Sequence, residues 1–173
     1  MDISIIDASK TNTEFGIKYG AEDAPKKVIE FVNLACPYSR QWFEESYELL
    51  EQAVAEGKAQ RVFKLFDKEK ESLQRGNVMH RYVTKNDGAQ AIKDIKKIYQ
   101  TQPDWKQLSL AEVAEYAEKI LGLKKQEQSD AQEIIDEAAA ATIRFVPTVI
   151  IGESIFDESI TYEELHQLVF DGE

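Results

Sequence analysis

The sequence contains one cysteine, Cys36, among its 173 residues. A single cysteine excludes an intrachain disulfide framework and fits a reducing compartment better than an oxidising one. No run of about 18 apolar residues occurs, which is the length that a membrane-spanning helix needs. Residues 1–7 also lack the basic start and the apolar segment of a secretory signal. We therefore expect a cytoplasmic protein with no segment in the membrane.

Basic residues and histidines are also scarce. The chain has 32 acidic and 21 basic residues, a formal net charge of −11, and no block of Lys and Arg that could follow a phosphate backbone. Nucleic acids and anionic membranes are therefore not expected as partners. His80 and His166 lie far apart with no ligand-spaced companions, so no metal site is expected.

The residues around the cysteine predict a strand that leads directly into a helix. Residues 28–34 are mostly β-branched, aromatic or aliphatic, and from Trp42 onward apolar residues recur at helical spacing. Pro37 suits the first position of a helix, which makes Cys36 the N-cap residue. There a thiolate is stabilised by free backbone N–H groups and by the positive end of the helix dipole. We interpret Cys36 as reactive; the alternative is an inert, buried cysteine.

The Cys-Pro-Tyr-Ser motif at residues 36–39, together with a distant Val-Pro-Thr at residues 146–148, resembles the thioredoxin superfamily. The stretch from Glu30-Phe31 to the motif is most similar to the DsbA branch. The resemblance covers most of the chain and implies an α/β, thioredoxin-like fold with an inserted all-helical subdomain. We expect residues 1–67 and 129–173 to form the thioredoxin-like domain and residues 68–128 to form the helical insertion.

The resemblance also assigns roles to residues of the motif and of the proline loop. The family has a second cysteine three residues after the first, where this chain has Ser39. Pro147 is expected to form a cis peptide bond and to lie against the cysteine, and the backbone of Val146 is expected to bind an extended substrate. Cys36, Ser39 and Pro147 are thus the expected catalytic residues, with Pro37 and Tyr38 in support.

A buried ion pair beneath the site is a further expectation from the resemblance. In the DsbA branch an acid six residues before the cysteine pairs with a lysine on the next strand, and Glu30 and Lys64 occupy those positions here. An unpaired buried charge is costly, and such a pair could also relay protons to Cys36. The alternative is that Glu30 faces solvent on a half-exposed strand.

Other elements follow from periodicity and helix-capping patterns. Strands are predicted at residues 14–19, 59–67 and 154–156, and the first of these alternates as an edge strand does. Gly57 is expected to end the helix that Cys36 begins, and Asp87 to cap a helix of the insertion. Capping boxes are predicted at residues 109–112, 129–132 and 161–164.

These features favour a thiol-disulfide oxidoreductase that uses one cysteine. Cys36 would attack a disulfide of a protein or small molecule, Ser39 would donate a hydrogen bond to the thiolate, and a second thiol would release the adduct. No tightly bound cofactor is expected, and glutathione is a candidate co-substrate. Two alternatives stay open: a glutathione transferase that resembles the kappa class, and a redox-tuned or redox-insensitive adaptor or chaperone that binds other proteins.

Overall fold

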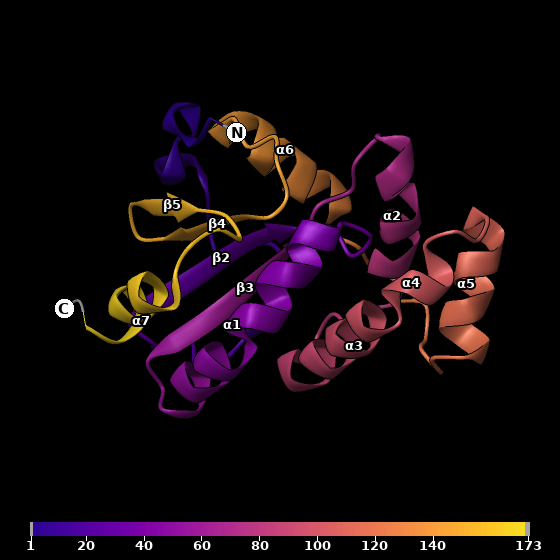
Figure 1. Cartoon of the computed structure of the whole chain (residues 1–173), viewed down its shortest axis with the longest axis horizontal. Coiled ribbons are helices and arrows are strands. Elements are labelled where there is room, and N and C mark those ends of the chain that lie inside the picture. The colour runs from indigo at the N-terminus through magenta and orange to yellow at the C-terminus, as the bar shows by residue number, and fades with distance from the viewer. Residues whose placement is uncertain (1, 172–173) are drawn as a thin grey trace.

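The computed structural model describes residues 2–171 and has a five-stranded sheet at its centre. The strand order is β1-β3-β2-β4-β5 (Figure 1). The strands are β1 (Ile17–Tyr19), β2 (Lys26–Val32), β3 (Ala59–Leu65), β4 (Thr148–Ile151) and β5 (Ser154–Phe156). The edge strand predicted at residues 14–19 is confirmed, because β1 borders the sheet and pairs antiparallel with β3.

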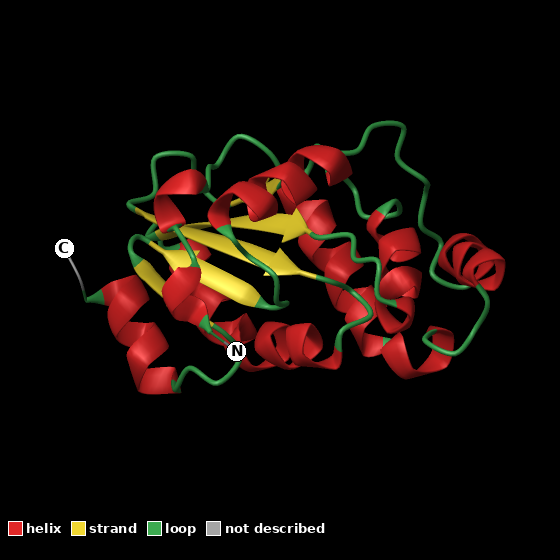
Figure 2. Cartoon of the chain, turned by 90° about the horizontal axis from the view of Figure 1, so that it is seen from above, coloured by secondary structure: helices red, strands yellow, loops and turns green. Residues whose placement is uncertain are grey.

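Helices cover both faces of the sheet, so that the sheet forms the middle layer (Figure 2). The α-helices are α1 (Pro37–Ala55), α2 (Gln74–His80), α3 (Gly88–Gln100), α4 (Gln102–Trp105), α5 (Leu110–Lys119), α6 (Ala131–Ala141) and α7 (Tyr162–Phe170). Short 3₁₀ helices occupy Ile3–Ile5, Ala8–Lys10 and Glu71–Leu73. Helices α2 to α5 gather at one end of the sheet, to the right in Figure 1, so the thioredoxin-like fold with a helical insertion is confirmed.

A β2-α1-β3 unit forms the centre of the fold. Strands β2 and β3 are parallel, with Val32 opposite Leu65, and α1 crosses between them. Cys36 is the N-cap of α1 and Pro37 is its first residue, as the sequence predicts. Gly57, at φ 73°, follows the helix end in a left-handed conformation that a side chain would disfavour.

Alternation along the strands separates two apolar cores. Val28 and Val32 of β2 pack in the larger core with α1 and the insertion, whereas Ile29 and Phe31 pack in the smaller core with α6. Successive residues of a strand point to opposite faces, which explains why neighbours in sequence enter different cores. The near-continuous apolar character of β2 follows from this two-sided burial.

The capping predictions are confirmed for three helices and wrong for one. Asp87 caps α3 by accepting a hydrogen bond from the backbone of Gln90, and full capping boxes begin α5 and α7 at Ser109 and Thr161. The predicted box at residues 129–132 does not form, because Asp130 is the N-cap of α6. The Ser129 hydroxyl instead accepts the backbone N–H of Ala131 at 3.1 Å.

Candidate active site

Cys36 faces the segment that precedes β4. Strand β4 is antiparallel to β2, and Thr148 at its start lies opposite Phe31 near the end of β2. This pairing brings the start of β4 to the junction where β2 leads into α1. The Val146–Pro147 peptide bond is cis, and the Cys36 Sγ lies 3.5 Å from the carbonyl oxygen of Val146. The free thiol, with Cys36 only 5% exposed, donates to this carbonyl.

Ser39 lies one turn after the cysteine and is fully buried. Its hydroxyl oxygen accepts the backbone N–H of Asn33 at 3.3 Å. Ser39 was expected to donate a hydrogen bond to the Cys36 thiolate. In the structure, where the thiol is protonated, no such bond is present among residues 2–171. Because the oxygen is the acceptor toward Asn33, the hydroxyl proton remains free to be donated.

Each of the two segments that meet at the site carries one exposed aromatic side chain. Tyr38 on the first turn of α1 is 58% exposed, and Phe145, just before Val146, is 41% exposed. Large exposed aromatic groups next to a reactive group are typical of binding surfaces. Tyr38 was expected to support the site, whereas nothing in the sequence pattern distinguished Phe145.

The loop at residues 33–36, which we call the cysteine loop, is buried and is held by polar side chains. Asn33 accepts the N–H of Ala35 at 2.9 Å, and the Gln102 side-chain amide donates to the carbonyls of Leu34 at 2.8 Å and Cys36 at 3.3 Å. His80 accepts the N–H of Leu34 at 3.2 Å. Gln102 and His80 come from the insertion. Sequence reasoning missed both, because a polar residue on a helix carries no signal of what it contacts.

Tyr99 of α3 places a phenol close to these groups. It is 1% exposed, and its hydroxyl has no hydrogen-bond partner among residues 2–171. Burial raises the pKa of Tyr99 well above its ordinary value, and the charges of Cys36 and Glu30 raise it further. Tyr99 therefore stays a neutral phenol. Its ring packs against Phe43 with the ring centroids 5.2 Å apart.

The predicted pairing of Glu30 with Lys64 is wrong. Residues opposite one another on neighbouring strands point to the same face, and here Glu30 lies opposite Phe63 while Lys64 lies opposite Phe31. Glu30 and Lys64 consequently point to opposite faces of the sheet. The alternative of a solvent-facing glutamate is also wrong, because Glu30 is fully buried.

Each of the two residues has its own buried partner. Glu30 binds Arg61 through two hydrogen bonds of 2.7 Å and accepts the indole N–H of Trp42 at 2.8 Å. On the other face, Lys64 donates to Glu137 of α6 at 2.7 Å. Burial lowers the pKa of Lys64, while Glu137 opposes that shift. Within residues 2–171 neither Glu30 nor Lys64 forms a hydrogen bond or ion pair with Cys36, so a direct proton relay through this pair has no geometric basis.

Residues 2–171 contain no group of three or more His, Cys, Asp or Glu side chains that could hold a metal ion. In the same part of the chain no helix is both long enough and apolar enough to span a membrane.

A thioredoxin-like fold whose N-cap cysteine faces a cis-proline loop defines the class of this protein. The Thioredoxin family model matches residues 12–171, and the chain belongs to that family. A comparison with curated proteins found no match.

Solved structures agree with this assignment. A conserved protein of unknown function from Enterococcus faecalis V583 is 58% identical, with a TM-score of 0.96, and the match covers 98% of this chain and 97% of that one. Oxidised BdbD from Bacillus subtilis is 15% identical, with a TM-score of 0.66, covering 95% and 93%. A periplasmic thioredoxin-like protein from Salmonella enterica serovar Typhimurium is 16% identical, with a TM-score of 0.57, covering 95% of each chain. The latter two share the fold.

The Glu30–Arg61 pair leads to a first prediction, on stability. Glu30→Gln leaves the Arg61 charge buried without its carboxylate and should lower the free energy of unfolding by about 3–5 kcal/mol. Glu44→Gln is the matched control, because Glu44 forms an exposed pair with Arg40 and should cost less than about 1 kcal/mol. Urea denaturation of both variants measures the difference. Equal effects would contradict the structural role given to Glu30.

Gly76 leads to a second prediction, on the cysteine loop. A Cβ at Gly76 would lie 2.7 Å from the backbone nitrogen of Ala35 and would also collide with Asn33. Gly76→Ala should therefore displace the loop, costing about 1–3 kcal/mol, and change the alkylation rate of Cys36. Gly57→Ala is the control: its left-handed φ of 73° makes it costly, but it lies beyond the other end of α1 and should leave that rate unchanged. Iodoacetamide kinetics on folded protein test this, and an unaltered rate in Gly76→Ala would refute it.

Proposed function

We propose that the protein is a thiol-disulfide oxidoreductase that works with the single cysteine Cys36. The observation that carries the proposal is the position of the Cys36 sulfur, at a helix N-terminus and 3.5 Å from the Val146 carbonyl of the cis-proline loop. A thiolate at this place is stabilised by the unpaired N–H groups of the first helical turn. The fold that it shares with BdbD is consistent with disulfide chemistry.

The exchange takes place in two steps with one thiolate consumed and one released in each. The Cys36 thiolate attacks one sulfur of a substrate disulfide, forms a mixed disulfide and expels the other sulfur as a thiolate. A second thiolate then attacks the substrate sulfur of the mixed disulfide and releases the Cys36 thiolate. The incoming thiol and the substrate end as a new disulfide, so Cys36 undergoes no net oxidation. Glutathione is the low-molecular-weight thiol that we propose for the second step.

Ser39 takes the place where a resolving cysteine would stand. Its buried hydroxyl oxygen accepts the Asn33 N–H, and a hydroxyl that accepts can still donate its own proton. When Cys36 loses its proton, the hydroxyl can turn to donate to the thiolate. A hydroxyl stabilises the charge but cannot form a disulfide with Cys36. The mixed disulfide must therefore be released by an external thiol.

Substrate recognition is proposed for Val146, Tyr38 and Phe145. The Val146 carbonyl accepts the thiol of Cys36 only while that thiol is protonated. Formation of the thiolate frees the carbonyl for a backbone N–H of an extended peptide. The exposed rings of Tyr38 and Phe145 would pack against side chains of the same peptide. We therefore propose disulfide-containing protein segments as well as small disulfides as substrates.

The cellular location stays a prediction. The single cysteine favours a cytoplasmic location, whereas the structurally similar Salmonella protein is described as periplasmic. The exchange scheme requires a pool of free thiol, and a reducing compartment supplies one.

The third prediction separates an oxidoreductase from an adaptor. Cys36→Ser keeps the size of the side chain and a donor for Val146, but it removes the nucleophile. The assay measures the reduction of a small disulfide by glutathione, with NADPH consumption by glutathione reductase as the readout. In Cys36→Ser the rate of this reduction should fall to the uncatalysed rate. If wild-type protein shows no rate above that background, or if Cys36→Ser retains the wild-type rate, the proposed function is wrong and the adaptor becomes the better interpretation.

The fourth prediction concerns the missing resolving cysteine. Ser39→Cys places a second thiol three residues after Cys36 and should allow an intrachain disulfide under mild oxidation. Thiol counting should fall from two to none per chain after oxidation. Ser46→Cys is the matched control, because Ser46 is also buried on α1 but lies ten residues from Cys36 and should keep both thiols. A Ser39→Cys protein that keeps two free thiols would contradict the proposed geometry.

A further inference from the structure

His80, at the end of α2, contacts the cysteine loop through one ring nitrogen and an acid through the other. Its Nε2 accepts the backbone N–H of Leu34 at 3.2 Å, and its Nδ1 lies 2.7 Å from the Asp67 carboxylate. The His80 side chain is fully buried, while that of Asp67 is 16% exposed. Neither residue is used in the exchange scheme described above.

These two contacts determine the protonation of the ring. An N–H of the backbone can only donate, so Nε2 must carry a lone pair and no proton. The carboxylate can only accept, so Nδ1 must carry the proton. His80 is therefore a neutral imidazole with the proton on Nδ1. Adding a proton to Nε2 would set two N–H groups against each other at Leu34.

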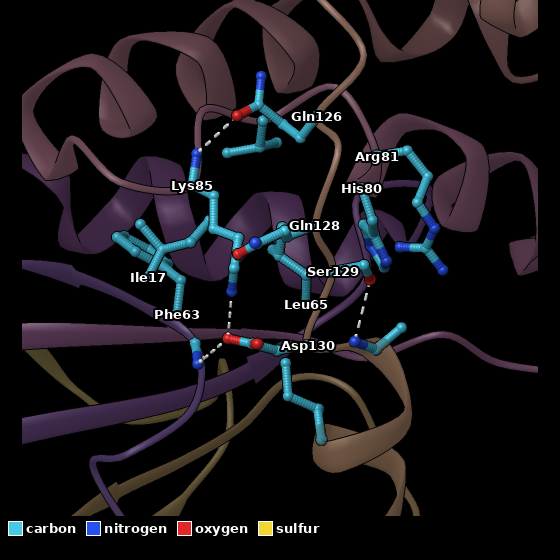
Figure 3. A pocket seen from close by; sticks show the side chains of 14 residues that line it. Ile17, Phe63, Leu65, His80, Arg81, Lys85, Gln126, Gln128, Ser129 and Asp130 are labelled. Carbon is cyan, nitrogen blue, oxygen red and sulfur yellow. Dashed lines mark hydrogen bonds and ion pairs between the residues drawn. The ribbon is translucent and has the colours of Figure 1, made fainter.

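The surroundings of His80 include charges from several elements. Asp67 follows β3, and Arg81, the next residue after α2, also pairs with Asp67. His80 also lines a cavity, shown in Figure 3, together with Lys85 and Asp130. Lys85 and Asp130 form an ion pair of 2.5 Å. Burial lowers the pKa of His80 below its ordinary value, although the Asp67 carboxylate opposes that shift. Burial alone would raise the pKa of Asp67, but its contacts with His80 and Arg81 hold it below its usual value.

The hydrogen bond from Leu34 matters for Cys36 because the cysteine loop has few anchors. Leu34 is two residues before Cys36, and both are buried. Within residues 2–171 the other side chains that bind the loop backbone are Asn33, Ser39 and Gln102. Loss of the His80 acceptor would leave a buried N–H without a partner, which costs enough to shift a short loop.

We propose that His80, oriented by Asp67, is a positioning residue for Cys36. In its neutral form His80 holds the cysteine loop in the arrangement that brings the sulfur to the N-terminus of α1. On acidification the imidazole takes up a proton, the Leu34 N–H loses its acceptor and the loop moves. The role in catalysis rests on the proposed function, whereas the movement of the loop does not.

The first test compares the only two histidines of the chain. The alkylation rate of Cys36 by iodoacetamide is followed from pH 8 down to the pH at which the protein begins to unfold, in wild type, His80→Gln and His166→Gln. Glutamine retains an amide donor and a carbonyl acceptor but does not titrate. His166 is exposed on α7, with 44% of its side chain accessible, and serves as the matched control.

Titration of the thiol itself is common to all three proteins. Below about pH 6.5, the ordinary pKa of histidine, wild type and His166→Gln should show an additional change in the alkylation rate. We expect this change to be about three- to tenfold, which is the effect of one lost hydrogen bond. His80→Gln should lack it. An identical pH profile in wild type and His80→Gln would overturn the proposal, as would loss of the additional change in His166→Gln.

The second test needs neither a substrate nor a stable His80 variant. Amide hydrogen exchange at Leu34, corrected for the intrinsic pH dependence, should become faster in wild type as the pH falls below about 6.5. Asp67→Asn removes the charge that favours the imidazolium, so the transition should move to lower pH. Constant protection of Leu34 down to the pH at which the protein unfolds, or an unshifted transition in Asp67→Asn, would overturn the proposal. Loss of disulfide exchange with this transition intact would instead refute only the proposed function.

Discussion

The buried cysteine loop imposes the constraint on which the site depends. A loop in the interior has no water to bind its N–H and C=O groups, so side chains must supply the partners. Here Gln102 and His80 of the insertion supply two of them. The insertion is thereby joined to the segment that carries Cys36 by specific hydrogen bonds as well as by apolar packing. This explains why it lies against the end of the sheet where β2 leads into α1.

Close packing at Gly76 reinforces this arrangement. Helix α2 approaches the loop so closely that there is no room for a methyl group between Gly76 and Ala35. Helix α2, through Gly76 and His80, and helix α4, through Gln102, both contact the cysteine loop. The position of the cysteine is consequently a property of the whole fold, even though the residue itself is the N-cap of one helix.

Much of this could be predicted from the sequence because its causes are local. The strand-to-helix transition at Cys36, the helix end at Gly57 and the capping boxes at Ser109 and Thr161 each depend on a few adjacent residues. The box predicted at Ser129 failed because α6 begins one residue later, with Asp130 as the N-cap residue. The Asp130 carboxylate makes no cap hydrogen bond and instead binds Gly16 and Lys85, which are distant in sequence. Local patterns cannot show such competition.

The pairing of buried charges depended on register and on the faces of the sheet. Glu30 and Lys64 are compatible in type and lie on neighbouring strands, but they point to opposite faces, and so Arg61 and Glu137 are their partners. Likewise, nothing in the sequence indicates that His80 reaches Leu34, because the contact spans 46 residues. The sequence by itself determined most of the elements, the place of Cys36 at the start of a helix and the family. Only the tertiary structure decided which side chains meet, because strand register and helix packing set those contacts over long separations.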